Sequence, residues 1–219
     1  MATKRTKSEL ETLEQSRVAL ENLDAQPEIS AVMSDLGFGP EERTIGNEIY
    51  QAARTAYNAN QIEDDETSVA YNEYVALKDQ LDSIYSTHRK KAKVIFRNDH
   101  TTADRLGITG SIPQAYLKWL DKVRKFYSVC LADEAIQTKL MRLKVSGRDL
   151  AGCNTLIDQV DTTRSKYLSE KGESQTATQI KDEALAKLDD WMSEFYAIAK
   201  IGLEDKPQLL ESLGKLVRN

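Results

Sequence analysis

The chain has 219 residues, a net charge of −5, 30% charged residues, and only four prolines and ten glycines. Its mean hydropathy is −0.54, and no apolar run approaches the roughly 20 residues that a bilayer requires, so we expect no membrane span. Residues 1–8 include basic side chains without an apolar stretch behind them, which argues against a secretory signal. The two cysteines lack metal-ligand spacing and indicate reduced thiols in a cytoplasm.

The first half of the chain predicts helices separated by short turns. The first helix should begin near Thr6 or Ser8, because Ser8 and Glu11 have the spacing of a capping box. Proline removes a backbone donor and suits a first helical position. This helix is therefore expected to break near residues 24–26 and to restart at Pro27.

Two long helices are then predicted over residues 41–62 and 66–97, with an acidic connector at 63–66 between them. The later helix has the clearest apolar pattern in the chain, with spacings of four and three that produce a heptad-like seam. The seam positions are Ala70, Tyr74, Leu77, Leu81, Ile84, His88 and Ala92. A short helix, capped by Thr101 or Thr102, completes this half.

The second half predicts the same order of elements. Its first helix should start close to Ser111 and Pro113 and, because it lacks an internal proline, run straight to Lys144. A glycine-containing link at 171–174 is expected to separate two further long helices. Pro207 then opens a last short helix.

The two halves also resemble each other residue by residue. At an offset of 107, residues 1–107 align without gaps on 108–214, and 18 of the 107 pairs are identical. Average composition gives roughly 6–8 identities by chance. Two amphipathic helices in phase would add leucine matches, but they do not easily produce the Ala-Lys and Leu-Gly pairs at 92–93 and 106–107 that recur together. We therefore interpret the sequence as two copies of one helical unit.

These patterns predict an all-α fold. No stretch shows the sustained alternation of a strand, and long helices joined by short turns pack as an antiparallel up-and-down helical bundle. We expect two tandem repeats, each with three long helices plus one short closing helix. The repeats span residues 1–107 and 108–219, either as two small bundles or with one shared core as a single domain.

The residue most suggestive of a site is His88, in the middle of the seam, where the offset position is Phe195. It is either a ligand or proton acceptor that lines a pocket between the repeats, or a core aromatic residue replaced by a histidine with one hydrogen bond. A single histidine without a carboxylate or thiol partner at helical spacing is usually structural, which favours the second interpretation. His100 lies in a polar turn and is expected to be solvated.

No catalytic or cofactor-binding motif occurs in the sequence. A di-iron carboxylate bundle requires Glu-x-x-His pairs, but Tyr85 and Arg97 stand three residues before the two histidines. The sequence also has no His-Glu-x-x-His, Cys-x-x-Cys, Gly-x-Gly-x-x-Gly or Gly-x-Ser-x-Gly pattern. We therefore expect no metal site, no cofactor and no catalytic residue.

Two arginines and two aspartates recur at the repeat offset. Arg17 and Arg124 lie beside apolar residues of the first helices, and Asp82 and Asp189 correspond to each other in the same way. Each arginine either forms a buried pair with such an aspartate or lies along the flank of the apolar stripe with its guanidinium in water. The second interpretation is favoured, and even a buried pair would specify packing rather than bind a ligand.

The densest basic run comprises Arg89, Lys90, Lys91, Lys93 and Arg97. Such a run either binds phosphate or an acidic partner, or it is the solvated face of a long helix, which is the commoner case. Aromatic side chains that could stack on bases are scarce around it, and residues 1–107 carry 13 basic and 19 acidic residues. The composition therefore argues against nucleic-acid binding.

The sequence alone does not determine a function. Its best interpretation is a non-enzymatic, cytoplasmic interaction or scaffold protein that binds a protein partner or self-associates, because long amphipathic helices occur without a catalytic pattern. The first alternative is a small-ligand binder or enzyme with a pocket between the repeats near His88. Association with nucleic acid through the basic helix faces is the weaker alternative.

Overall fold

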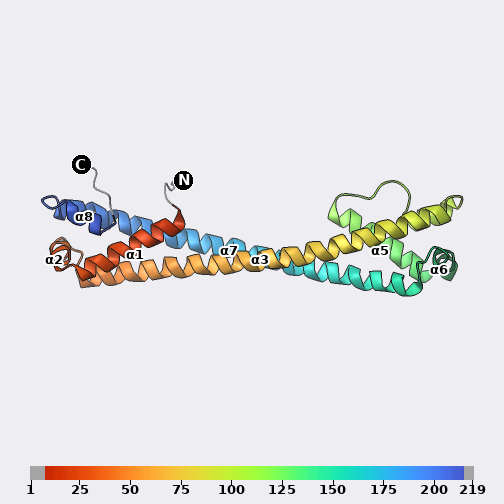
Figure 1. The fold of residues 1–219 in the computed structure, drawn as a ribbon, viewed down its shortest axis with the longest axis horizontal. Coiled ribbons are helices and arrows are strands. Elements are labelled where there is room, and N and C mark those ends of the chain that lie inside the picture. The colour runs from red at the N-terminus through yellow and green to blue at the C-terminus, as the bar shows by residue number, and fades with distance from the viewer. Residues whose placement is uncertain (1–7, 215–219) are drawn as a thin grey trace. The chain divides into compact units, whose positions relative to one another are not determined.

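The computed structural model describes residues 8–214, and every regular element in that range is a helix (Figure 1). The prediction of an all-α fold is thus confirmed. None of the helices in the described range is both long enough and apolar enough to cross a lipid bilayer. The expectation about a secretory signal concerns the first residues of the chain, and residues 1–7 lie outside the described range.

The helix bounds recur along the chain. The two longest helices each contain 56 residues, and their first residues, Pro40 and Gly147, are 107 positions apart. The first helix of each half has 17 residues, and these helices begin at Glu9 and Tyr116, again 107 positions apart. In order, the elements are α1 (Glu9–Ala25), α2 (Pro27–Asp35), α3 (Pro40–Ile95), α4 (His100–Arg105), α5 (Tyr116–Ala132), α6 (Glu134–Met141), α7 (Gly147–Gly202) and α8 (Gln208–Ser212).

Helix caps near the N-terminus follow the sequence. Glu11 N donates to Ser8 Oγ at 3.2 Å, and Ser8 N donates to Glu11 Oε2 at 2.8 Å, which completes the predicted capping box. The predicted break is also confirmed, because α1 ends at Ala25 and α2 begins with Pro27. The short helix α4 is capped by Asp99 and not by either of the predicted threonines.

The predicted division of the long helices is wrong. The helices expected over 41–62 and 66–97 are one continuous helix, α3, because the acidic residues between them include no proline or glycine and are compatible with a helix. Similarly, α7 continues through the link predicted at 171–174. A helix tolerates one exposed glycine such as Gly172 at a cost of about 1 kcal/mol. Each half of the sequence therefore has one 56-residue helix in place of two long ones.

The predicted first helix of the second half is also wrong at both ends. α5 begins at Tyr116 rather than near Pro113, and it stops at Ala132 instead of continuing to Lys144. Asp133 causes the stop, because its side chain accepts hydrogen bonds from two backbone N–H groups at the start of α6, at 3.1 and 3.2 Å. An N-cap aspartate thus breaks the helix without any proline.

The chain forms two compact units, and each draws on both halves of the sequence. Unit 1 comprises residues 8–65 and 172–214 of the described chain, and unit 2 is Glu66–Lys171. Because α3 and α7 each contribute to both units, unit 1 contains α1, α2, the beginning of α3, the end of α7 and α8. Unit 2 contains the corresponding set, which consists of α5, α6, the beginning of α7, the end of α3 and α4. The boundaries between the two units therefore lie at residues 65/66 and 171/172 and not at residue 107, where the sequence offset divides the chain.

In unit 1, aromatic side chains of α7 fill the space next to α3. The rings of Trp191 and Phe195 stack with centroids 5.5 Å apart, and Phe38 meets both of them edge-on. The Trp191 indole lies directly on the backbone of Gly46, where a Cβ would be only 2.3 Å from its Cζ2 atom. This glycine is therefore required for close packing between α3 and α7 in unit 1.

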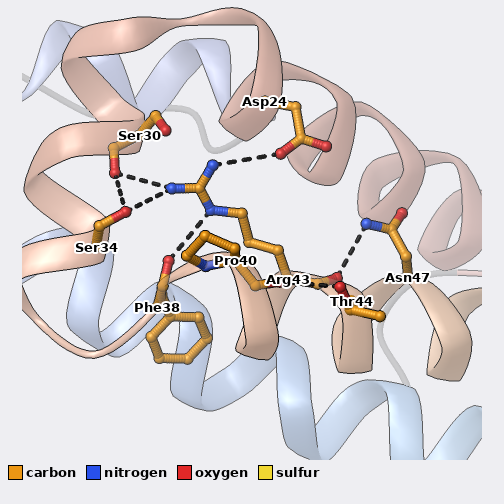
Figure 2. A network of polar contacts seen from close by, with 8 residues as sticks. All are labelled: Asp24, Ser30, Ser34, Phe38, Pro40, Arg43, Thr44 and Asn47. Carbon is orange, nitrogen blue, oxygen red and sulfur yellow. Dashed lines mark hydrogen bonds and ion pairs between the residues drawn. The ribbon is translucent and has the colours of Figure 1, made fainter.

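Arg43 stabilises the turn between α2 and α3 in the same unit through hydrogen bonds (Figure 2). Its guanidinium donates to two backbone carbonyls of α2 and the following turn at 3.0 and 3.2 Å, and to Ser34 Oγ at 2.6 Å. The Asp24 carboxylate at the end of α1 lies 3.5 Å from Nη1. The offset position is the buried Leu150, so unit 2 has no counterpart of this arginine.

Unit 2 has a different aromatic centre. The rings of Tyr85, Phe126 and Tyr127 lie with centroids between 5.1 and 6.3 Å apart. The seam predicted on α3 does face this core, since Leu81 is fully buried and His88 is only 8% exposed. The two units thus have the same arrangement of helices but different side chains in their cores.

We predict that Gly46→Ala lowers stability by about 1–3 kcal/mol, because the indole of Trp191 cannot yield 1 Å without displacing the stacked rings behind it. Gly172→Ala is the matched control, because a Cβ at that position would meet no other part of the chain within 4 Å. It should gain up to about 1 kcal/mol of helix propensity. Urea unfolding of both variants measures the difference, and a shift of the same sign and size in both would contradict the packing described.

Candidate functional site

The candidate site is an open pocket of unit 2 between α3 and the beginning of α7, with a volume of about 630 Å³. Its floor is formed by buried or half-buried side chains, and its rim by exposed polar ones. The floor residues are Ile84, His88, Cys153 and Leu156, and the other lining residues are Gln80, Lys144, Arg148, Asp149, Gly152 and Gln159. The structure thus places His88, the residue that the sequence singled out, in a pocket wall.

A chain of polar contacts lies behind this wall. His88 Nδ1 is 3.2 Å from the hydroxyl of Tyr127, which is fully buried on α5. The same hydroxyl forms a hydrogen bond with the thiol of Cys153 on α7. Since Nδ1 is engaged with Tyr127, Nε2 is the ring nitrogen of His88 that is available to a ligand.

Burial sets the charge state of all three groups. It lowers the pKa of His88 below the ordinary value of 6.5, and the nearby charge of Lys91 lowers it further, while Asp149 acts in the opposite direction. Burial also raises the pKa of the Tyr127 phenol and of the Cys153 thiol. At neutral pH, His88, Tyr127 and Cys153 are therefore uncharged, and the floor of the pocket is polar without being ionic.

The rim carries the charges of the pocket. Lys144 and Arg148 are exposed, and neither side chain has a hydrogen bond or ion-pair partner within residues 8–214. Asp149 is already engaged, because it accepts hydrogen bonds from the backbone N–H and the hydroxyl of Ser146 at 2.9 and 2.7 Å. These bonds lower the pKa of Asp149, so its charge is used to cap α7.

Lys144 has an unusual backbone conformation. Its φ is 56°, and no other residue apart from glycine has a positive φ in the described part of the chain. It lies at the C-terminus of α6, where Lys144 N donates to Met141 O and Val145 N donates to Leu140 O. This double hydrogen bond is the Schellman motif, whose left-handed position usually holds glycine. The offset residue is Gly37, which has a φ of 100° and the same pair of hydrogen bonds around it.

At the corresponding positions of unit 1, the space is partly filled by an indole, and only part of it remains as a groove. There the residues that align with Ile84, His88 and Cys153 are Trp191, Phe195 and Gly46, and the tryptophan packs onto the glycine. The groove that remains in unit 1 is smaller, about 370 Å³, and is lined mainly by aliphatic side chains and by Glu48, Glu183 and Lys187. The pocket of unit 2 is therefore open where unit 1 is filled by an indole.

The other predicted site residues lie away from this pocket. Arg17 pairs with Glu14 and Glu21 of its own helix at 2.5 and 2.6 Å. Arg124 forms an ion pair with Asp161. These partners replace the aspartates that the repeat offset suggested, and both guanidinium groups lie on exposed helix flanks.

The two recurring aspartates have separate environments. Asp82 accepts a 2.6 Å hydrogen bond from the indole Nε1 of Trp119 on α5, which joins α3 to α5 in unit 2. Asp189 is half-buried on the part of α7 that belongs to unit 1. Neither lines the pocket beside His88.

The predicted basic face is not a single surface. Arg89 is buried, and its guanidinium donates to the carbonyls of Ile108 and Gly110 at 2.9 and 2.5 Å, so it fastens the loop after α4. Lys93 approaches the same Gly110 carbonyl at 3.4 Å. Lys90 and Arg97 are exposed, and Lys91 is half-buried near His88. A continuous phosphate-binding stripe would need Arg89 at the surface.

Sequence reasoning missed most of the pocket. Lys144 belongs to the turn between α6 and α7, and Arg148 and Cys153 belong to the first residues of α7, far from His88 in the sequence. A signal was present in the offset alignment, where Lys144 replaces a glycine that ends a helix. His88, Cys153 and Asp149 do not form a group of ligand atoms close enough to share one metal ion, within the residues that the structure describes.

Comparison of the chain with protein-family models, with curated proteins and with solved structures finds no match. Function is therefore inferred from the geometry of the chain itself.

We predict that His88 makes folding pH-dependent. As the pH falls through 6.5, the unfolded chain binds a proton at His88 before the folded protein does. Stability is therefore fully present above that value and decreases as the pH falls towards the lowered pKa of the folded state, by at most about 1.4 kcal/mol per pH unit. His88→Phe, the residue of unit 1, should remove this part of the decrease in urea unfolding between about pH 7.5 and 5.5.

The control is His100→Gln, which alters the exposed histidine of α4. This variant should retain the wild-type loss of stability over the same pH interval. If His88→Phe loses as much stability between the two pH values as wild type does, the assigned role of His88 is wrong.

Proposed function

We propose that this protein is a non-enzymatic helical binding protein that arose by tandem duplication, and that its ligand is a small molecule held in the pocket beside His88. The observation that carries the proposal is the contrast between the two units. In unit 1, aromatic rings pack at positions whose aligned residues in unit 2 line an open pocket with a polar floor. If the two units derive from one duplicated core, the opening of the pocket in unit 2 does not serve stability, and ligand binding would explain it.

Duplication is supported by features that a shared amphipathic pattern would not produce. The bounds of α3 and α7 are offset by 107 residues at both ends. The left-handed positions recur at the same offset, as Gly37 with Lys144 and Gly107 with Gly214. In this proposal the two copies each supply one long helix to both compact units, which is the form that the predicted two-repeat bundle takes.

Binding is favoured over catalysis by the state of the candidate nucleophile. A reactive cysteine needs a stabilised thiolate, but burial raises the pKa of the Cys153 thiol. The hydrogen bond from Tyr127 acts in the opposite direction but does not outweigh burial, and the Cys153 side chain is only 4% exposed. Both cysteines are unbridged, which is compatible with the predicted cytoplasmic location. We therefore interpret His88, Tyr127 and Cys153 as a rigid polar floor.

A second candidate function is self-association, the protein-binding role that the sequence favoured. It is supported by exposed aliphatic side chains that recur at the repeat offset. Val94 and Ile201 are 64% and 68% exposed, and Leu10 and Leu117 are 51% and 71% exposed. An aliphatic side chain kept in water at both equivalent positions suggests a contact with a second copy of the chain.

Filling the pocket tests the proposed function. We predict that Ile84→Trp with Cys153→Gly, which gives unit 2 the residues of unit 1, folds stably and loses small-molecule binding. Saturation-transfer difference NMR with a defined library of neutral and charged fragments measures binding to wild type and to this variant. Fragments that bind wild type should lose most of their signal with the filled variant.

The matched control is Ala52→Trp, which adds an indole to the groove of unit 1 and leaves the His88 pocket unchanged. It should bind the same fragments as wild type. Equal binding to wild type and to the filled variant, or the absence of any binding fragment, would contradict the proposal.

For self-association, we predict that the wild-type chain forms a dimer in size-exclusion chromatography with light scattering, and that Val94→Lys with Ile201→Lys makes it monomeric. Charged groups at these positions cannot be buried without a large desolvation cost. The control is Val69→Lys, because Val69 is 63% exposed on the same helix but aligns with a threonine. A monomeric wild type would reject this second candidate.

A further inference from the structure

We infer that the ligand of the His88 pocket is a small organic anion with an apolar body, and that Lys144 and Arg148 hold its charged group. This inference rests on the proposed function and names the chemical class of ligand for the same pocket. The charge of the rim, the backbone of Lys144 and the composition of the floor each support it.

The rim of the pocket has reversed its charge relative to unit 1. Lys144, Arg148 and Asp149 carry a net charge of +1, whereas the aligned residues Gly37, Glu41 and Glu42 carry −2. Asp149, the one acid among the described lining residues, is committed to Ser146. The two cations have no partner within the described chain, so they are free to pair with an anion.

Lys144 occupies a backbone position that a lysine does not favour. A residue with a Cβ is strained at a positive φ, and glycine or asparagine would fit better. Unit 1 has glycine at this point of the same Schellman motif. A lysine kept at a strained position, with its side chain on a pocket wall, points to a role of the ammonium group in that pocket.

The floor defines the rest of the ligand. Ile84 and Leu156 supply aliphatic contact next to the rim cations, and Gln80 and Gln159 line the pocket further along the two helices. Asp149 and Gln159 are separated by ten helical residues, which corresponds to about 15 Å. This order of lining residues fits a ligand with an anionic group at one end and an apolar body of a few carbon atoms. It also leaves room for a polar group at the other end of the ligand.

A matched pair of probes tests the inference. The anion 4-phenylbutanoate and the neutral 4-phenylbutanamide have the same shape and differ in charge. Both are titrated into 15N-labelled wild-type protein, and binding is followed through the backbone amide signals of His88, Gly152 and Cys153. We expect the anion to bind about five- to tenfold more tightly than the amide.

Two variants separate the contribution of the rim charges. Lys144→Asn and Arg148→Gln should each bring the affinity of the anion close to that of the amide, without changing the affinity of the amide. Lys144→Asn should also keep or raise the melting temperature, because asparagine tolerates the left-handed conformation better than lysine does. Arg142→Gln, which removes an exposed charge from the end of α6 outside the pocket, should bind both probes as wild type does.

The outcomes distinguish this inference from the proposed function. Equal binding of the two probes to wild type, at the pocket signals, would overturn the anion inference and leave small-molecule binding intact. Failure of either variant to reduce the preference for the anion would also overturn it. If neither probe shifts the pocket signals at any accessible concentration, both this inference and the proposed function are wrong.

Discussion

The whole structure depends on the burial of two 56-residue helices by each other's flanking elements. Neither half of the sequence contains a complete core. In unit 1, Phe38 from the first half packs against Trp191 and Phe195 from the second. In unit 2, Tyr85 from the first half packs against Phe126 and Tyr127 from the second. Each compact unit exists only when α3 and α7 are both present, so the two halves must fold together.

This constraint also explains why a pocket could form between the halves. One wall comes from α3 and the other from α7, so a change on either helix alters the fit without disturbing the helix itself. Unit 2 has the smaller Ile84 where unit 1 has a tryptophan, and it has Cys153 where unit 1 has the glycine that this tryptophan requires. The order of helices is the same in both units, while the volume between the helices differs.

The polar floor of the pocket differs as a group from the aligned residues of unit 1. The aligned residues of His88, Tyr127 and Cys153 are Phe195, Leu20 and Gly46, none of which carries a polar side-chain atom. A lone histidine in an apolar core would lose its hydrogen bonds to water without replacement. His88 instead contacts the hydroxyl of Tyr127, which in turn bonds to Cys153. A buried polar group that gains a hydrogen-bond partner is less costly than one that lacks it, so these three polar side chains are best understood together.

Much of the fold could be predicted from local rules. The capping box at Ser8, the break before Pro27 and the seam through His88 depend on neighbouring residues or on helical periodicity, and the structure has all three. The breaks predicted within α3 and α7 were wrong because acidic residues or one glycine weaken a helix without ending it. The stop at Asp133 was missed because a capping aspartate resembles any surface aspartate in the sequence.

The pocket could be predicted only in part, because its residues come together through tertiary packing and not through a local sequence pattern. His88 was noticeable because a histidine aligned with a phenylalanine, but nothing local joins it to Lys144 or Arg148, which reach the same space through the packing of α7 on α3. Lys144 is also costly where it stands, since its φ of 56° is one that glycine adopts freely. An open pocket in place of packed rings and a lysine at a positive φ each lower stability, and both occur at one place in one unit. The proposed ligand would account for the occurrence of both costs at the same place.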